Sequence, residues 1–511
     1  MIASPLMRSL IAVCVVIPWA VLAHEHSDLA SPDAKLGSVS FQISCKSEVT
    51  ADFNHGVALL HSFWHDEALR TFKEVALHDP ECAIAYWGQA MSAFHLYWSH
   101  PSASELTSGK AALAQAAAAR EMSPREDAYI EALRNLFDEY QPDSPDPSVR
   151  RFSAAMGQLV EQYSSDVEAN AFYALSLLAA QPDGAPTLSN AQKAAAVLQP
   201  LLKDHRDHPG IAHYLIHACD HPGMAKQGLA AARRYASIAP AAPHALHMPS
   251  HIFARLGIWQ DDIRSNLASK AAAETALGRQ AGAENRLHAM EFLEYAYLQT
   301  GQFDQARAIV AEAKAVPRSE ARDDDYYLTV QARIAATYTI ETRDWAMAVH
   351  LAPVTNAHWY SEAHTLLANA MAAGHQHDAV AGVAAGQRLD ALLSPILAKI
   401  GTLPAESSSA DLSDEIHAWA EFSQGHVDRA TNLLRPIAER QSIVGKGEVE
   451  LPAREMLADM LLLDGRASQA LKEYRTSLVS DPGRRNALAG ARMAAEQASR
   501  DARHSSHGPD R

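Results

Sequence analysis

Apolar and small residues recur along this chain in an order that predicts pairs of antiparallel helices. A packed first helix, a turn at glycine, a small residue, an aromatic residue and a terminating proline follow one another in each unit. Near the C-terminus these positions are Leu457, Leu461, Gly465, Ala470, Tyr474 and Pro482, and near the N-terminus they are Gly56, Leu59, Ala68, Phe72, Val75 and Pro80. The unit is about 34 residues long, the length of a two-helix repeat.

The same spacing places helix pairs over most of the chain. We predict them at 47–79, 83–118, 124–163, 166–203, 209–239, 243–280, 285–316, 324–352, 360–395, 411–442 and 453–481, with a last helix at 484–499. Such units bury their apolar faces only against neighbouring units. The expected fold is therefore all-α, a right-handed solenoid of about eleven helix pairs of the tetratricopeptide type, with a concave groove.

The N-terminus predicts export. Residues 1–8 carry one positive charge, residues 10–19 are apolar, and Val21-Leu22-Ala23 ends in a small residue. This pattern is typical of a signal peptide at 1–23, cleaved before His24. We expect secretion, into the periplasm of a cell with two membranes. Residues 24–46 then form a leader, 47–203 the N-terminal repeats, 204–318 a histidine-rich repeat region, 319–499 the C-terminal repeats, and 500–511 a disordered tail.

Composition and motifs exclude several functions. The net charge of the 511 residues is −16, without a cluster of lysine and arginine, so we predict no nucleic-acid partner. No segment after the signal is long and apolar enough to predict a membrane span. The sequence has no phosphate-binding glycine loop, no nucleophile elbow and no HExxH motif, so it indicates neither a nucleotide cofactor nor a reaction class.

Three cysteines remain after removal of the signal: Cys45, Cys82 and Cys219. Cys45 precedes the first predicted helix and Cys82 begins the second unit, so the two ends are expected to lie close together. In an oxidising compartment they would form a disulfide, which leaves Cys219 unpaired. The alternative is that all three are buried as small apolar residues.

Two pairs of histidines are separated by one repeat. His213 and His217 are followed by His247 and His251, and the interval between corresponding members is 34 residues. Within each pair the i, i+4 spacing puts both rings on one face of a helix. Eight of the 26 histidines fall between residues 205 and 251. The repetition predicts a functional site built on successive helices.

Three segments carry a family resemblance. They are Phe63 to Ala68 with Asp79 to Gly88, His208 to His217, and His244 to Phe253. Together they resemble a group of exported, histidine-rich bacterial tetratricopeptide-repeat proteins without an established activity, and the resemblance covers nearly the whole mature chain. It implies the solenoid fold and the export but supplies little chemistry.

In tetratricopeptide repeats the matching positions of successive first helices line the concave groove, so the resemblance implies that several side chains face one cavity. The aligned columns are Gly210, His244 and His288; His213, His247 and Glu291; and His217, His251 and Tyr295. Asp220 and His221 lie one helical turn beyond His217 and should also reach this cavity. His61 and His95 are also 34 residues apart, and Trp87 is expected to face the groove.

These residue types predict a transition-metal site, with copper or zinc as the expected ion. The predicted ligands are His213, His217, His244, His247, His251, His288 and Glu291, and Glu291 is also the candidate catalytic base. His61, Trp87, His95, Asp220, His221 and Tyr295 are the predicted contacts to a ligand or partner in the groove.

Three interpretations follow. The first is a solenoid that binds a transition metal together with a protein, peptide or small-molecule ligand. The second is a metal-dependent hydrolase or oxidoreductase that uses the histidine and glutamate cluster. The third is a plain protein-interaction scaffold, in which the histidines contact carboxylates of a peptide.

Overall fold

The computed structural model describes residues 35–97, 101–120, 122–141, 146–181, 187–275, 282–405, 407–447 and 449–506. The predicted signal peptide and the first part of the leader lie outside the described residues. Within the described ranges the secondary structure is helical, without strands. None of the helices searched there has the length and hydropathy needed to cross a membrane.

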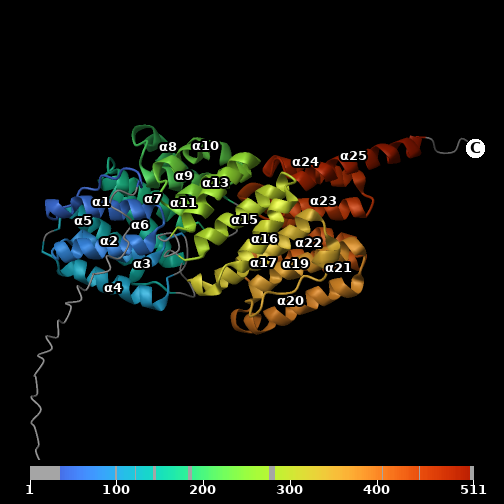
Figure 1. The fold of residues 1–511 in the computed structure, drawn as a ribbon, viewed down its shortest axis with the longest axis horizontal. Helices are drawn as coiled ribbons and strands as arrows, with labels where there is room; N and C mark the ends of the chain where they lie inside the picture. The colour runs from blue at the N-terminus through green and yellow to red at the C-terminus, as the bar shows by residue number, and fades with distance from the viewer. Residues whose placement is uncertain are drawn as a thin grey trace, which may run out of the picture.

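The helices form a single tetratricopeptide-type α-solenoid (Figure 1). Those of the N-terminal part are α1 (Thr50–His61), α2 (His65–His78), α3 (Ala83–Phe94), α4 (Ala103–Ala118), α5 (Pro124–Phe137), α6 (Asp146–Gln162), α7 (Val167–Ala179) and α8 (Ser189–Asp204). The middle part contains α9 (Pro209–Cys219), α10 (Ala225–Ile238), α11 (Pro243–His247), α12 (Pro249–Arg255), α13 (Trp259–Ala273), α15 (Glu284–Gln299) and α16 (Phe303–Ala315). The C-terminal part contains α17 (Asp324–Thr342), α18 (Trp345–Ala348), α19 (Trp359–Gln376), α20 (Ala379–Ile400), α21 (Ser408–Ser423), α22 (Val427–Val444), α23 (Ala453–Leu463), α24 (Ala467–Ser480) and α25 (Arg485–Ser506).

The predicted helix pairs match these elements closely, with two differences. The first helix of the unit at 243–280 is divided into α11 and α12 at Met248, because Pro249 lacks the N–H that a continuous helix would use. The predicted disorder after residue 499 is wrong as far as Ser506, since α25 continues to that residue. Its Ala487 and Ala494 are buried against the preceding unit, while its other side is exposed and includes Leu488 and Met493, as expected for the last helix of the array.

Aromatic rings of second helices insert against glycines of first helices, which explains the small residues in the repeat pattern. The ring of Phe72 on α2 lies between Gly56 and Gly88, where an added Cβ would be 2.8 Å and 2.5 Å from it. Such close approach excludes any larger side chain at these two positions. The pattern of glycine and aromatic residues therefore reports how neighbouring units pack.

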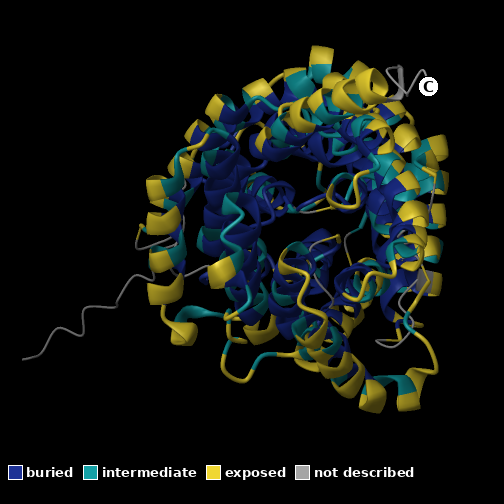
Figure 2. Ribbon diagram, turned by 90° about the vertical axis from the view of Figure 1, so that its right-hand side faces the viewer, coloured by how far each residue is buried: buried dark blue, intermediate teal, exposed yellow. Residues whose placement is uncertain are grey.

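The inner side of α9, which was expected to line the concave groove, is buried. Seen along the long axis, the helices form a ring whose outer rim is largely exposed, and some exposed segments also lie inside the ring (Figure 2). Every residue of α9 is buried. The loop after α22 enters the interior, where His221 Nδ1 bonds the Val444 carbonyl at 2.7 Å and Lys446 Nζ bonds Glu415 at 2.8 Å. Side chains that a looser superhelix would expose are therefore packed against each other.

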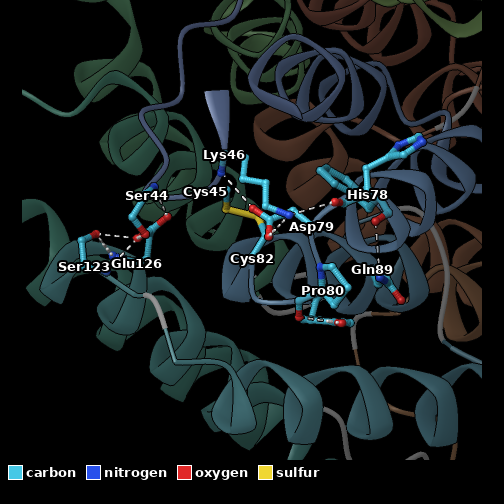
Figure 3. Close-up of a disulfide and its surroundings, with 12 residues drawn as sticks. Ser44, Cys45, Lys46, His78, Asp79, Pro80, Cys82, Gln89, Ser123 and Glu126 are labelled. Atoms are coloured by element: carbon cyan, nitrogen blue, oxygen red, sulfur yellow. Dashed lines mark hydrogen bonds and ion pairs between the residues drawn. A yellow bond between two sulfur atoms is a disulfide. The ribbon is translucent and has the colours of Figure 1, made fainter. Parts of the chain in front are cut away.

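Part of the predicted leader, residues 35–46, packs against the repeats. The Ser38 amide donates to the Asp207 carbonyl at 2.8 Å, and Phe41 is buried. Cys45 and Cys82 form a disulfide with their Cα atoms 4.9 Å apart, while Cys219 is free and buried (Figure 3). Beside the disulfide the Lys46 amide donates to Asp79 at 2.8 Å.

Candidate metal centre

Six histidines form two adjacent groups in the interior. The first triad is His213 and His217 from α9 with His244 from α11. The second triad is His247 from α11, His251 from α12 and His288 from α15. Within each triad, ring nitrogens of all three residues lie within 4.8 Å of one another. Each triad therefore combines an i, i+4 pair with one histidine from the next repeat.

The Nε2 atoms of the first triad converge on one point. Nε2 of His213 lies 3.0 Å from that of His217 and 3.1 Å from that of His244. Nitrogen ligands at about 2.0–2.1 Å from a tetrahedral ion are themselves about 3.3 Å apart. The three rings are thus arranged nearly as they would be around one metal ion, with a fourth coordination position open.

The second triad repeats this arrangement. Nε2 of His247 lies 3.0 Å from Nε2 of His251, and His288 is the third member. The break between α11 and α12 at Pro249 falls between the first two residues. Because both segments stay nearly helical through Met248, the i, i+4 relation is preserved and the two rings remain on one side.

Hydrogen bonds at Nδ1 fix the orientation of three of the rings. His213 Nδ1 donates to the His61 carbonyl at 2.6 Å, and His251 Nδ1 donates to Asp220 at 2.8 Å. His247 Nδ1 donates to Asn266 Oδ1 at 2.7 Å, and both protons of the Asn266 amide are used by Asp262. Metal-bound histidines typically carry such partners, which leave Nε2 free to coordinate.

Burial favours the neutral form of four of the six rings. It lowers the pKa of His213 to about 3 and holds the pKa values of His217, His244 and His247 well below the usual range. The mutual repulsion of neighbouring imidazoles acts in the same direction for the last three. Neutral imidazole is the form that binds a metal.

Asp220 is the charged partner of the second triad. Burial alone would raise the pKa of its carboxyl, but Arg255 and His251 hold that pKa well below the usual range. Arg255 Nε donates to the other carboxylate oxygen at 2.8 Å. The ionised Asp220 therefore orients His251. From the sequence, it is predicted as a contact to a ligand or partner.

Each triad is covered by a phenylalanine. The ring centroid of Phe63 lies 4.4 Å from that of His213 and 5.4 Å from that of His244. Phe292 lies 4.6 Å from His251 and 4.8 Å from His247. The apolar rings exclude bulk water from the ligating nitrogens, which strengthens metal–ligand electrostatics.

Glu291 does not occupy the predicted place among the ligands. Its carboxylate is bound by Arg333, with Nη2 2.8 Å from Oε2, and it lies 3.6 Å from Nδ1 of His288. An arginine-bound carboxylate at the Nδ1 side of His288 is positioned to orient that ring. Glu291 is thus paired with Arg333 and grouped with neither triad, and its roles as ligand and as general base stay predictions.

The other predicted groove contacts are mostly interior packing residues. Trp87 is buried among Phe41, Tyr129 and Phe172, away from both triads. His95 follows α3, with its ring 4.7 Å from that of His65, and it belongs to neither triad. Trp87 does not face a groove, because side chains of the first units bury it.

Two further predicted contacts lie beside the second triad. Tyr295 is buried beside the cavity that His251 also lines, and Arg484, just before α25, donates to its hydroxyl. His221 bonds the Val444 carbonyl and is absent from the triads. Both residues thus connect the histidine region to the C-terminal units.

His61 belongs to a separate buried cluster with Glu168 and His208. Nε2 of His61 and Nε2 of His208 lie 2.7 Å and 2.9 Å from the two Glu168 oxygens. Burial alone would raise the pKa of Glu168, but the two imidazoles hold it well below its usual range. The carbonyl of His61, rather than its ring, contacts the first triad.

Several residues that shape the centre carry no repeat signal in the sequence. They are Asn266, Arg255, Arg333, Phe63, Phe292 and Glu168. Phe63 comes from a unit far earlier in the chain than the triad it covers, and Glu168 joins His61 and His208 in the separate cluster. Only the position of Phe292, next to Glu291 on the third aligned helix, associates one of them with the columns.

Comparison with known proteins gives distant similarity only. No family model matches the chain, and no curated protein matches its sequence. Among solved structures, the P58(IPK) TPR domain is 10% identical over 89% of this chain and 99% of its own, with a TM-score of 0.20. Yeast Tom70 is 11% identical over 89% of both chains, with a TM-score of 0.30. A monomeric mutant of IFIT1 with Gppp-AAAA is 10% identical over 92% of this chain and 99% of its own, with a TM-score of 0.37.

Proposed function

We propose that this protein binds two transition-metal ions, one in each histidine triad, in the interior of a tetratricopeptide-type solenoid. Three neutral nitrogen ligands suit copper or zinc, and neither triad includes a thiolate or a carboxylate among its described ligands. The open fourth position leaves each ion able to bind a small ligand. Export, which residues 1–23 predict, would place the centre in the compartment where the Cys45–Cys82 disulfide forms.

One observation carries the proposal. His247 and His251 both use the Nδ1 proton, so in the neutral rings both Nε2 atoms bear only a lone pair. These atoms are 3.0 Å apart in a buried site. Two acceptors at that distance repel each other unless a cation lies between them. Three ring nitrogens converge at this place, so a metal ion is the fitting cation.

A peptide bound against the histidines lacks room. The cavity beside His251 and Phe292 has a volume of about 30 Å³, the space of one or two water molecules. Of the six histidines only His251 is more than a tenth exposed, at 11% of its side chain. A protein partner of this solenoid would therefore bind its outer surface, apart from the histidine centre.

The test is metal analysis of the purified mature protein and of variants. We expect two equivalents of copper or zinc in the native chain, one equivalent in His217→Ala or His251→Ala, and none in the double variant. His221→Ala is the matched control, because that histidine lies in the same segment but outside both triads. Absence of bound metal in the native chain after equilibration with copper and zinc, or unchanged content in the double variant, would refute the proposal.

A further inference from the structure

We infer that the two triads form one dinuclear copper centre that binds dioxygen between its two ions. This inference rests on the proposed function, since it requires that both triads hold a metal. It adds the identity of the ion pair, its coupling and the class of ligand that completes the coordination.

The two triads are close enough to share a ligand. His244 and His247 come from successive turns of α11, yet they belong to different triads, and their ring centroids are 6.1 Å apart. The rings of His217 and His251 are 6.3 Å apart. Two-metal sites hold their ions about 3.5–4 Å apart, and these short ring separations place the two triads close enough for ions bound in them to share one small ligand.

The ligand set favours copper over the metals that require oxygen ligands. Magnesium, manganese and calcium require oxygen ligands, and pairs of such ions depend on carboxylates. Here the carboxylates nearest the rings, Asp220 and Glu291, are bound to Arg255 and Arg333 on the Nδ1 sides of His251 and His288. Three imidazoles complete the coordination of Cu(I), and Cu(II) accepts the additional ligand that the open position offers.

The cavity beside the second triad has room only for a very small ligand. Phe63 and Phe292 pack against the two triads, and the cavity of about 30 Å³ beside His251 and Phe292 admits a molecule the size of water or dioxygen, with Asp220, Arg255 and Lys446 also among its lining residues. Dioxygen is apolar, so it enters such a site without the desolvation cost that an anion would meet.

The electron balance uses both ions. Each Cu(I) gives up one electron and becomes Cu(II), and dioxygen accepts both electrons to become a peroxide dianion bound between them. Two copper–oxygen bonds form at the open positions, no bond of the protein breaks, and no proton is taken up. One copper ion alone supplies only one of the two electrons, so the step requires both triads.

The test begins with protein loaded with two equivalents of Cu(I) under nitrogen and then exposed to dioxygen. We expect an intense near-ultraviolet charge-transfer band that appears with dioxygen, and a loss of most of the Cu(II) electron paramagnetic resonance signal, because the two ions are coupled. His217→Ala and His251→Ala should each keep one copper ion, lack the band, and show the full signal of an isolated Cu(II) after chemical oxidation. His221→Ala should behave as the native protein.

Two bound copper ions that give a full two-spin signal and no band would overturn the inference while leaving the proposed function intact. Binding of zinc with exclusion of copper would do the same. Failure to bind any metal would overturn both. The band in a variant with only one copper ion would show that coupling is not needed and would likewise overturn the inference.

Discussion

The interior of this solenoid contains two kinds of buried histidine cluster, and their compositions alone do not tell them apart. His61, Glu168 and His208 lie within 4.8 Å of one another, as the members of each triad do. In that cluster, however, every polar group has a complementary partner. The Tyr214 hydroxyl bonds His61 Nδ1 at 2.9 Å, the Ile211 amide donates to His208 Nδ1, and both Nε2 atoms donate to the Glu168 carboxylate.

Two members of the second triad lack this complementarity. At His247 and His251 the Nδ1 protons are already donated to Asn266 and Asp220, so the Nε2 lone pairs face each other. The difference teaches that convergence of histidines is a weak criterion for a metal site. The proton inventory of the surrounding groups distinguishes a hydrogen-bonded core from a site that needs a cation.

The largest expected effect separates the two clusters by stability. Glu168→Ala leaves two buried imidazoles without their acceptor and should lower the free energy of unfolding by about 3–5 kcal/mol, also in metal-free protein. Urea denaturation of the metal-free forms measures it. Glu168→Gln keeps the size and one acceptor and should lose less. An unchanged urea midpoint for Glu168→Ala would mean that this cluster does not contribute to the free energy of unfolding.

Metal should stabilise the triads and not the other cluster. At a free metal concentration 100 times the dissociation constant, each site adds about 2.7 kcal/mol to the free energy of unfolding. The difference between unfolding curves with metal and with chelator measures this gain. It should vanish in the His217→Ala, His251→Ala double variant, whereas Glu168→Gln should retain it. A gain in the double variant would place the metal elsewhere.

The partners at Nδ1 should tune the triads separately. Asn266→Ala removes the acceptor of His247 and should weaken metal binding at the second triad about 10–100-fold, with the first triad unaffected. Competition with a chromogenic chelator resolves the two affinities. Ser269→Ala is the control, because Ser269 is buried on the same helix, α13, and bonds the Pro243 carbonyl instead. Equal affinities in native and Asn266→Ala protein would contradict the assigned role.

Gly210→Ala tests the hydrogen-bonded cluster by crowding it. A Cβ at Gly210 would lie 2.3 Å from Nδ1 of His61, so the ring must shift and its bonds to Tyr214 and Glu168 must lengthen. We expect a loss of about 1–3 kcal/mol in thermal unfolding, typical of overpacking. Gly223→Ala is the control, since an added Cβ there meets no atom within 4 Å. Similar melting temperatures for the two variants would argue against tight packing around His61.

The smallest effect concerns acid. The pKa of Glu168 is depressed in the folded protein, so its contribution to stability is present above the unfolded value of about 4.3 and is lost as the pH falls below it. One such group gives a slope of at most about 1.4 kcal/mol per pH unit. Metal-free Glu168→Gln should therefore lose stability less steeply below pH 4.3 than the native chain. Parallel curves would show that Glu168 does not titrate in this way.

The helices were predictable because the residues that define the repeat act on neighbours close in the sequence. Gly56, Phe72 and Pro80 mark a close helix contact, an inserted ring and a helix end within one unit, and each acts on residues nearby. The i, i+4 relation of His213 and His217 is likewise a property of a single helix. The sequence therefore predicts which histidines share a helical face.

The grouping of the histidines was less accessible, because it depends on how one unit is placed on the next. The alignment of repeats pairs His244 with Gly210, and not with His213 or His217. In the structure, α11 is shifted relative to α9, and the three histidines meet. Glu291 was assigned to a ligand column because Arg333, 42 residues later, gives no sign that it will bind this carboxylate. Burial of the inner side chains depends on the curvature of the whole array, which cannot be predicted from the sequence of one unit.

The leader segment changes how the array is expected to unfold. Repeat proteins usually contact only adjacent units, so their ends fray independently. Here the Lys35 carbonyl accepts from the Ala241 amide, the Ser38 amide bonds Asp207, and the disulfide at Cys45 ties the same segment to α3. These two backbone bonds link the leader, which precedes α1, to residues that flank the α9–α10 unit some two hundred residues later. The units from α1 to α10 should therefore open together, as one cooperative block with a slow, topologically non-local folding step, rather than peel from the N-terminal end.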